Sequence, residues 1–230
     1  EDIDLRELSD VGSCAEIAGA RAPAIVDALV AGAAALPPWG FAEQDGRLAV
    51  RGFDRCAASG VRVPSFLVVD LERPAVLAAL SAAGAAVIDD ADAEALRIAA
   101  GVPGEGSEIV EAYNPLELAL HDAIHWGKGC YIGQEVIARL DTYAKVGKRL
   151  VGLNLDDAVR ASIAPGAQIL VGGKPAGVVT SVSPHDNGEL PSALAIIAGA
   201  TPAGAVQIQR VDGVRDARVV ERAAAQLPHD

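Results

Sequence analysis

The sequence predicts an α+β protein, in which a ferredoxin-like α/β layer is followed by a small C-terminal β-barrel. Strand-like and helix-like stretches follow one another over residues 1–90, which favours an α+β layer. Residues 91–147 have mainly helical patterns, and from residue 148 short apolar runs are separated by turn residues, as in a closed or half-closed barrel. We therefore expect three segments: the α+β domain (1–90), a helical segment (91–147) and the barrel (148–230).

The composition narrows the class of protein. A chain of 230 residues with 51% hydrophobic residues can bury a substantial core. Its net charge of −12 argues against broad nucleic-acid binding. No run of about 18 apolar residues occurs, so no membrane span is expected. Three cysteines without a C-x-x-C pair do not form a disulfide framework, which favours a reducing, cytoplasmic location.

The first segment begins with local strand and helix patterns. A helix is expected from Pro23 onward, because proline suits the first turn and apolar residues follow at helical spacing. Pro37-Pro38-Trp39-Gly40 indicates a loop. A second helix is expected over 74–83, and strands are expected over 3–8, 14–17, 48–50, 65–70 and 86–89.

The helical segment opens with clear boundaries. Asp90 can cap a helix over 90–100, Gly101 can take the left-handed position after it, and Pro103 prevents its continuation. Glu94 and Arg97, three residues apart, are expected to form a surface pair on this helix.

A second helix is expected from Pro115 through Ala123. It would place His121 and His125 on one face, and the stretch resembles the zinc-protease pattern H-E-x-x-H with Asp122 at the glutamate position. Zinc needs a third protein ligand, and none is indicated except the nearby Cys130. Two exposed or capping histidines are therefore favoured over a metal site.

The last segment shows six short strand patterns separated by turns. Gly172-Gly173 and Asp212-Gly213 are typical of tight hairpins. The strands are expected over 149–155, 168–171, 177–182, 193–198, 206–211 and 218–221.

The stretch K-G-C-Y-I-G-Q-E, residues 128–135, joins the helical segment to the barrel. Residues 128–149 contain five basic and two acidic side chains within an acidic protein. This reversal of charge fits either an anion site or a solvated basic turn. A short amphipathic helix is expected over 133–140, with Val136, Ile137 and Leu140 on its apolar side.

Cys130 is the one residue of this stretch with a thiol, which can act as a nucleophile when it is ionised. It lies beside Lys128 and just before the expected helix, and both the ammonium group and the helix dipole would favour the thiolate. The hypothesis is a reactive thiol. The alternative is a packed one, since free cysteine is among the most buried residue types.

The K-G-C-Y-I-G-Q-E stretch, with Val136 to Leu140 after it, resembles the signature of the folate-binding YgfZ family, relatives of the glycine-cleavage T-protein (aminomethyltransferase). Residues 95–103, 114–117, 148–153 and 177–181 resemble further motifs of that family in the same order. The aminomethyltransferases carry an acidic residue at the position of Cys130 and usually a glutamate at that of Ala99, so the chain is similar to the YgfZ branch. Compared with the family, residues 1–90 look like a later part of its chain, so the N-terminal part of the aminomethyltransferase-type folate-binding domain is expected to be missing.

The resemblance implies tetrahydrofolate, or a folate derivative, as cofactor and iron–sulfur client proteins as partners. It further implies a role in assembling or repairing clusters, with indirect effects on tRNA modification. In this interpretation Cys130 is the functional thiol, Lys128 sets its charge state, and Gly129 lets the backbone approach closely. The expected cofactor-binding residues are Arg97, Tyr131, Gln134, Glu135 and Arg139.

An alternative that the resemblance leaves open is a folate-dependent aminomethyl or one-carbon transferase. Cys130 in place of the acid and Ala99 in place of the glutamate count against it. A single cysteine cannot hold a cluster, because clusters need several thiolates. A cluster role would therefore require a partner or a second monomer.

Overall fold

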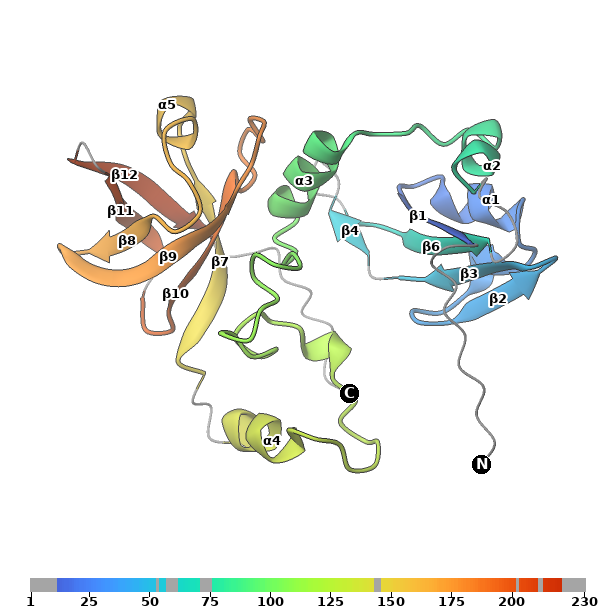
Figure 1. Cartoon of the computed structure of the whole chain (residues 1–230), viewed down its shortest axis with the longest axis horizontal. Coiled ribbons are helices and arrows are strands. Elements are labelled where there is room, and N and C mark those ends of the chain that lie inside the picture. The colour runs from blue at the N-terminus through green and yellow to red at the C-terminus, as the bar shows by residue number, and fades with distance from the viewer. Residues whose placement is uncertain are drawn as a thin grey trace. The chain divides into compact units, whose positions relative to one another are not determined.

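The computed structural model describes residues 12–52, 54–56, 62–70, 76–142, 146–201, 203–210 and 213–220. The chain divides into two compact units, unit 1 (Glu1–Asp89) and unit 2 (Asp90–Asp230), shown in Figure 1. Among the described helices, none is long and apolar enough to cross a membrane.

Unit 1 is built on a four-stranded antiparallel sheet of order β1-β6-β3-β2. Its strands are β1 (Ser13–Ala18), β2 (Phe41–Gln44), β3 (Arg47–Arg51) and β6 (Ser65–Asp70). Asp45 and Gly46 join β2 to β3 with positive φ angles of 52° and 76°, as a primed two-residue hairpin turn requires. A separate pair is formed by β4 (Arg55–Cys56) and β5 (Arg62–Val63).

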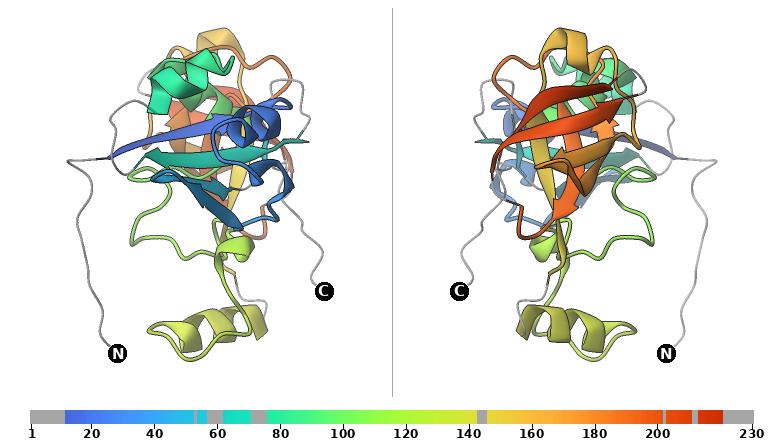
Figure 2. Two further views of the ribbon diagram at one scale, coloured as in Figure 1. Left: turned by 90° about the vertical axis from the view of Figure 1, so that its right-hand side faces the viewer. Right: turned by 90° about the vertical axis from the view of Figure 1, so that its left-hand side faces the viewer.

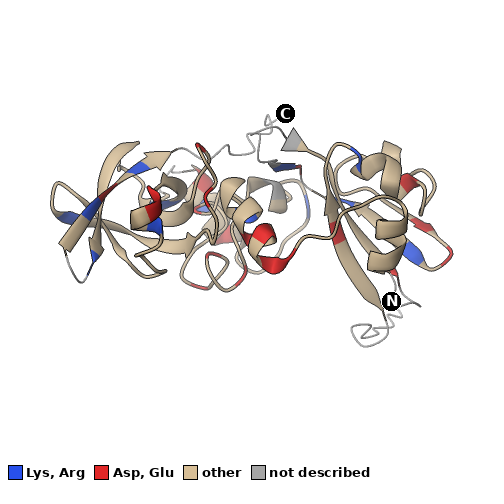
Figure 3. Cartoon of the chain, turned by 90° about the horizontal axis from the view of Figure 1, so that it is seen from above, with Lys and Arg blue, Asp and Glu red and all other residues tan. Residues whose placement is uncertain are grey.

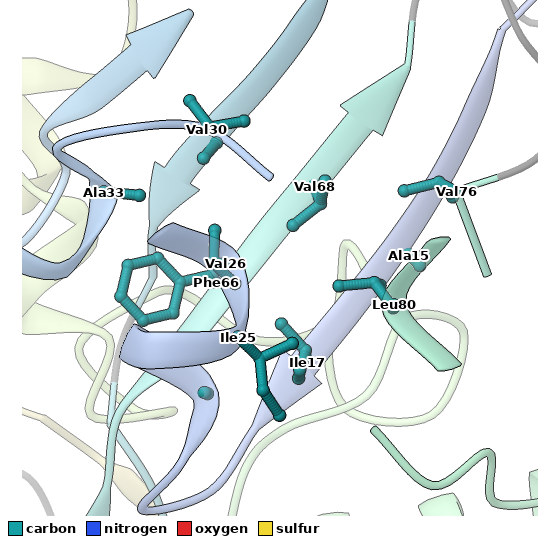
Figure 4. Packing of buried hydrophobic residues seen from close by; sticks show 12 residues of the cluster. Ala15, Ile17, Ile25, Val26, Val30, Ala33, Phe66, Val68, Val76 and Leu80 are labelled. Carbon is teal, nitrogen blue, oxygen red and sulfur yellow. The ribbon is translucent and has the colours of Figure 1, made fainter. Parts of the chain in front are cut away.

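Helices α1 (Ala22–Asp27) and α2 (Val76–Ala82), with the short 3₁₀ turn η1 (Ala33–Ala35), contribute to the core on one face of this sheet. Figure 4 shows Val26 of α1 near Phe66 of the central strand β6, and Leu80 of α2 near Ala15 of β1; all four belong to one core cluster. Pro23 lies in the first turn of α1, as the sequence predicts. The antiparallel sheet with helices confirms the α+β class, while the finer ferredoxin-like topology stays a prediction.

Three of the predicted strands of unit 1 are confirmed as β1, β3 and β6. The predicted strand over 3–8 lies outside the described residues, as does the start of the predicted helix before Val76. The strand predicted over 86–89 is wrong, because no neighbouring strand pairs with it among the described residues. Val87 and Ile88 are both exposed, so the alternation that a half-buried strand would show is missing.

Unit 2 contains a closed six-stranded barrel of order β10-β7-β12-β11-β8-β9. The yellow-to-red strands of Figure 2 belong to it. All six predicted strands are confirmed, and Gly172 and Gly173 make the β8–β9 turn with φ angles of 56° and 75°. The predicted Asp212-Gly213 hairpin falls partly outside the described residues. The strands are β7 (Lys148–Asn154), β8 (Gln168–Val171), β9 (Lys174–Val182), β10 (Ala193–Ala198), β11 (Gly204–Arg210) and β12 (Gly213–Val220).

Among its described residues, unit 2 has three α-helices besides the barrel: α3 (Asp90–Ala99), α4 (Gln134–Thr142) and α5 (Asp157–Arg160). α3 ends as predicted, with Gly101 at a φ of 68°. Its buried Ile98 packs with Leu118 and with Leu150, Leu194 and Ile196 of strands β7 and β10. This second core fixes α3 against the barrel.

The helix predicted from Pro115 through Ala123 is wrong, because residues 115–119 form hydrogen-bonded turns and no α-helix. Asn114 and Glu117 form a capping box, in which Asn114 Oδ1 accepts from the Glu117 amide at 3.0 Å and Glu117 Oε2 accepts from the Asn114 amide at 3.1 Å. Ala119 then adopts a φ of 52°, which ends the turn, and a 3₁₀ turn η2 (His121–Ala123) follows. His121 and His125 therefore do not share the face of one α-helix.

Candidate functional site

Residues 128–135, here called the motif segment, lead directly into α4. Gly133 has a φ of 91°, which favours glycine at the point where the chain turns into the helix. The turn is closed by two hydrogen bonds: the Gln134 amide donates to Tyr131 O at 3.2 Å, and the Tyr131 amide donates to Gln134 Oε1 at 3.4 Å. Gln134 therefore has a structural role at the start of α4.

The motif segment and α4 are open to solvent. The predicted helix is confirmed, but none of its side chains is buried. Ile132 is fully exposed, and Val136 is exposed as well. Of the apolar side predicted for this helix, Val136 is exposed, and Ile137 and Leu140 are half-buried.

Cys130 is exposed and forms no disulfide. The alternative of a packed, buried thiol is thus wrong. An exposed thiol can meet a small molecule or a protein partner without any rearrangement of the chain. Its enhanced reactivity stays a prediction, because accessibility alone does not favour the thiolate.

Lys128 lies over an aromatic ring of the same segment. Its Nζ is 4.8 Å from the centroid of the Tyr131 ring, within the range of a cation–π contact. Tyr131 is half-buried. The two side chains form a basic, aromatic surface immediately beside Cys130.

The other described basic residues of the predicted anion site all contact protein groups of unit 2. Arg139 forms an ion pair with Glu135 at 2.5 Å, with exposed fractions of 66% and 83%. Lys148 Nζ lies 5.1 Å from the ring of Tyr113, and Arg149 donates to Thr201 O at 2.7 Å. Lys145 lies outside the described residues. Figure 3 colours the basic residues of the described chain blue and the acidic residues red.

Arg97 lies in a network of hydrogen bonds between α3, the loop after it and the barrel. Its Nε and one terminal nitrogen donate to Glu94 at 2.7 and 2.6 Å. Further bonds go to Val102 O at 2.6 Å, Glu108 at 3.1 Å and Ser181 Oγ at 2.8 Å. Each of the five N–H donors of an arginine thus has a protein acceptor. In this arrangement Arg97 positions parts of unit 2 and has no donor left for a cofactor.

Glu108 is the residue of this network that sequence patterns did not reveal. It is fully buried, and besides Arg97 it accepts from the Gly104 amide at 2.8 Å and from Ser181 Oγ at 2.7 Å. A carboxylate in a glycine-rich loop has no periodicity that would indicate burial. The predicted Glu94–Arg97 pair is confirmed, and the hydrogen bond from Arg97 lowers the pKa of Glu94 below its ordinary value.

Gly104 packs directly against this guanidinium group. A β-carbon at Gly104 would lie 2.9 Å from Arg97 Cζ, closer than side chains normally approach. The glycine in Pro103-Gly104 therefore serves the network around Arg97.

The structure does not assemble the zinc-protease pattern. His125 is exposed, and its Nδ1 accepts a hydrogen bond from the Gly127 amide at 3.2 Å. Across the residues that the structure describes, no three His, Cys, Asp or Glu side chains are grouped so as to hold a metal ion. A zinc hydrolase therefore has no support from the described geometry.

Comparisons with known proteins identify sequences and a structure that are similar to this chain. No family model matches the sequence. The Arabidopsis thaliana protein named "Putative transferase At1g60990, chloroplastic" is 43% identical over 109 residues, or 47% of this chain and 24% of that protein. Aminomethyltransferases of Symbiobacterium thermophilum and Moorella thermoacetica are 33% and 35% identical over 139 and 130 residues, or 59% and 56% of this chain.

A crystal structure of the glycine cleavage system aminomethyltransferase T from Bartonella henselae superposes with a TM-score of 0.67 and 22% identity. The superposition covers 90% of this chain and 58% of that one. The chain is similar in sequence to these aminomethyltransferases and similar in fold to this structure. Its α+β architecture with a C-terminal six-stranded barrel is shared with that structure. The matches to the three curated relatives span 24%, 36% and 35% of their lengths.

Proposed function

We propose that this aminomethyltransferase-like chain binds tetrahydrofolate and acts in the assembly or repair of iron–sulfur clusters in client enzymes, with indirect effects on tRNA modification. The observation that carries the proposal is the motif segment, in which the exposed Cys130 lies between Lys128 and Tyr131, whose side chains are in contact. The expected cytoplasmic location belongs to the same proposal, and cell fractionation tests it.

The side chains of the motif segment suit the chemistry of a folate. Folates combine a flat pterin with an anionic glutamate tail. Lys128 offers an exposed ammonium group for the tail, and the Tyr131 ring offers an aromatic surface. Arg139 can join them if it leaves Glu135, and the exposed pair costs little to open. Arg97 is excluded from this set, because its donors are occupied.

The exposure of Cys130 favours work on a protein partner. Catalytic groups usually lie in sites that exclude water, where electrostatic stabilisation is strongest. Cys130 instead lies at an open surface, where a client protein can approach it. One thiolate does not hold a cluster, so the client would supply the remaining ligands.

Isothermal calorimetry with tetrahydrofolate tests the cofactor part of the proposal. We expect Lys128→Ala to weaken binding about tenfold, as loss of one charge-assisted contact does. Cys130→Ala should leave the affinity unchanged. Lys174→Ala is the matched control, since Lys174 is also an exposed lysine of unit 2 but lies on β9. Absence of binding by the unaltered chain would refute the cofactor assignment.

Complementation tests the cluster part. In cells that lack the protein, the activity of iron–sulfur enzymes after oxidative stress should be restored by the unaltered chain and not by Cys130→Ala. Equal restoration by Cys130→Ala would remove the thiol from the proposal while leaving folate binding intact.

The alternative is a folate-dependent aminomethyl or one-carbon transferase, favoured by the named relatives. Ala99, at the position of the family's usual glutamate, is 6% exposed in α3. Its methyl group supplies no acid or base to such a reaction. Release of ammonia with formation of methylene-tetrahydrofolate from an aminomethyl donor would establish the transferase instead.

A further inference from the structure

The loop between β9 and β10, residues 183–192, contains an asparagine followed by glycine, Asn187-Gly188. The chain has two other asparagines, Asn114 and Asn154, and neither precedes a glycine. Asparagine before glycine is the dipeptide most prone to deamidation, because glycine has no side chain to hinder attack of its nitrogen on the asparagine amide. We call residues 183–192 the docking loop, which Figure 1 shows in orange beside α3.

The side-chain amide of Asn187 attaches the docking loop to α3. Its Nδ2 donates to Ala95 O of α3 at 3.2 Å and to Pro191 O, near the end of the loop, at 2.8 Å. A second contact joins His185 Nε2 of the loop to Asp92 Oδ1 of α3 at 3.4 Å, between exposed side chains. Because exposed pairs of this kind contribute little to stability, the Asn187 amide is the stronger of these two polar links.

The residues beside Asn187 suit the deamidation reaction. Gly188 has a φ of 61°, a conformation that favours glycine, and its amide donates to Asp186 Oδ1 at 2.9 Å. In the reaction the Gly188 nitrogen forms a bond to Asn187 Cγ and gives up its proton, which the Asp186 carboxylate is placed to accept. The bond from Cγ to Nδ2 then breaks, and Nδ2 takes up this proton and leaves as ammonia. Water opens the resulting succinimide to aspartate or isoaspartate.

The product of this reaction does not fit the contacts that Asn187 makes. An oxygen without a proton replaces Nδ2, so it would face the carbonyl oxygens of Ala95 and Pro191 where two hydrogen bonds now exist. The new carboxylate also adds a negative charge beside Asp186, in a loop that already contains Glu189. A docking loop with a carboxylate at position 187 is therefore repelled from α3.

We propose that Asn187 is a deamidation site and that its conversion releases the docking loop from α3. In the docked loop two hydrogen bonds hold the leaving nitrogen, and they must open before the reaction can proceed. At about fivefold for each hydrogen bond, the folded chain reacts about 25-fold more slowly than the unfolded chain. Deamidation thus loosens α3, the helix that carries Arg97, gradually as the protein ages.

Peptide mass spectrometry of the full chain during incubation at mildly alkaline pH tests the chemistry. Asn187 should convert in the folded chain, and about 25-fold faster in urea-unfolded chain. Asn154 is the matched control, because its Nδ2 also donates to a carbonyl oxygen of the docking loop, Glu189 O at 3.1 Å, but leucine follows it. Conversion of Asn187 no faster than that of Asn154 would overturn the assignment. Equal rates for Asn187 in folded and unfolded chain would overturn the restraint by α3.

Hydrogen exchange of the α3 peptide tests the consequence. In Asn187→Asp, exchange over residues 90–99 should rise at least about fivefold. Asn154→Asp adds the same charge at the end of β7 and should leave the exchange of α3 unchanged. The deamidated fraction of the unaltered chain, separated by ion exchange, gives the same readout without any substitution. Unchanged α3 exchange in both Asn187→Asp and this fraction would overturn the proposal.

Discussion

Replacement of Arg97 by alanine should destabilise unit 2 strongly, because it leaves a buried carboxylate without its counter-charge. Glu108 is fully buried, and Arg97 itself is 17% exposed in this ion pair. The substitution also removes the hydrogen bonds that join α3 to Val102 and to Ser181 of β9. Both the anchoring of α3 and the charge balance around Glu108 would therefore be lost.

The size of the loss in unfolding free energy depends on the hydrogen bonds that Glu108 keeps after the substitution. Breaking a buried ion pair from one side typically costs about 3–5 kcal/mol. Glu108 would keep its bonds from the Gly104 amide and Ser181 Oγ, at 2.8 and 2.7 Å, so we expect the lower end, about 3 kcal/mol. The double substitution Arg97→Met with Glu108→Gln removes both charges, and it should recover at least half of the loss.

Urea unfolding followed by circular dichroism, with hydrogen exchange of the α3 and β9 peptides, measures this effect within unit 2. Arg139→Ala is the control: it breaks the exposed ion pair with Glu135 and should cost less than about 1 kcal/mol. A loss for Arg97→Ala as small as that of the control, or a double variant no more stable than Arg97→Ala, would refute the inferred role of the network.

Three further predictions concern pH and glycine positions. Arg97 lowers the pKa of Glu94. The ionised Glu94 therefore stabilises the fold at any pH above 4.5, the ordinary pKa of the side chain, and this stabilisation is lost as the pH falls through the lowered pKa. In Glu94→Gln, the stability measured by circular dichroism should depend less on pH in that range. A β-carbon at Gly177 would collide with the backbone of Ile196 and Ile197, so Gly177→Ala should cost roughly 2–3 kcal/mol in urea unfolding, whereas Gly147→Ala, in open space, should change stability by less than about 0.5 kcal/mol. Space is also open at Gly129, so Gly129→Ala should leave thermal stability unchanged and weaken tetrahydrofolate binding only if the ligand approaches this backbone.

The barrel could be predicted from the sequence because its strands and turns are each specified by residues that are neighbours in the chain. Each strand has a short apolar run, and glycine pairs such as Gly172-Gly173 fix the turns between them. The helix after Gly133 could be predicted equally well, since its apolar residues recur at helical spacing. The accessible thiol of Cys130 could be proposed from the sequence, but only the structure excludes a packed position for it.

Features that depend on tertiary contacts could not be predicted from patterns in the sequence. The helix predicted from Pro115 does not form, and Ala119 takes a positive φ, although the capping box at Asn114 is an ordinary start signal. The burial of Glu108 depends on Arg97 and Ser181, which lie 11 and 73 residues away along the chain.

The central claim is that the motif segment binds tetrahydrofolate. Hydrogen exchange of the intact chain, with and without saturating tetrahydrofolate, tests it most directly, because this segment and α4 are open to solvent and should exchange rapidly without ligand. The claim predicts slower exchange over residues 128–140 on ligand addition and a weaker effect in Lys128→Ala. Unchanged exchange there, or slowing confined to the barrel or to unit 1, would contradict it.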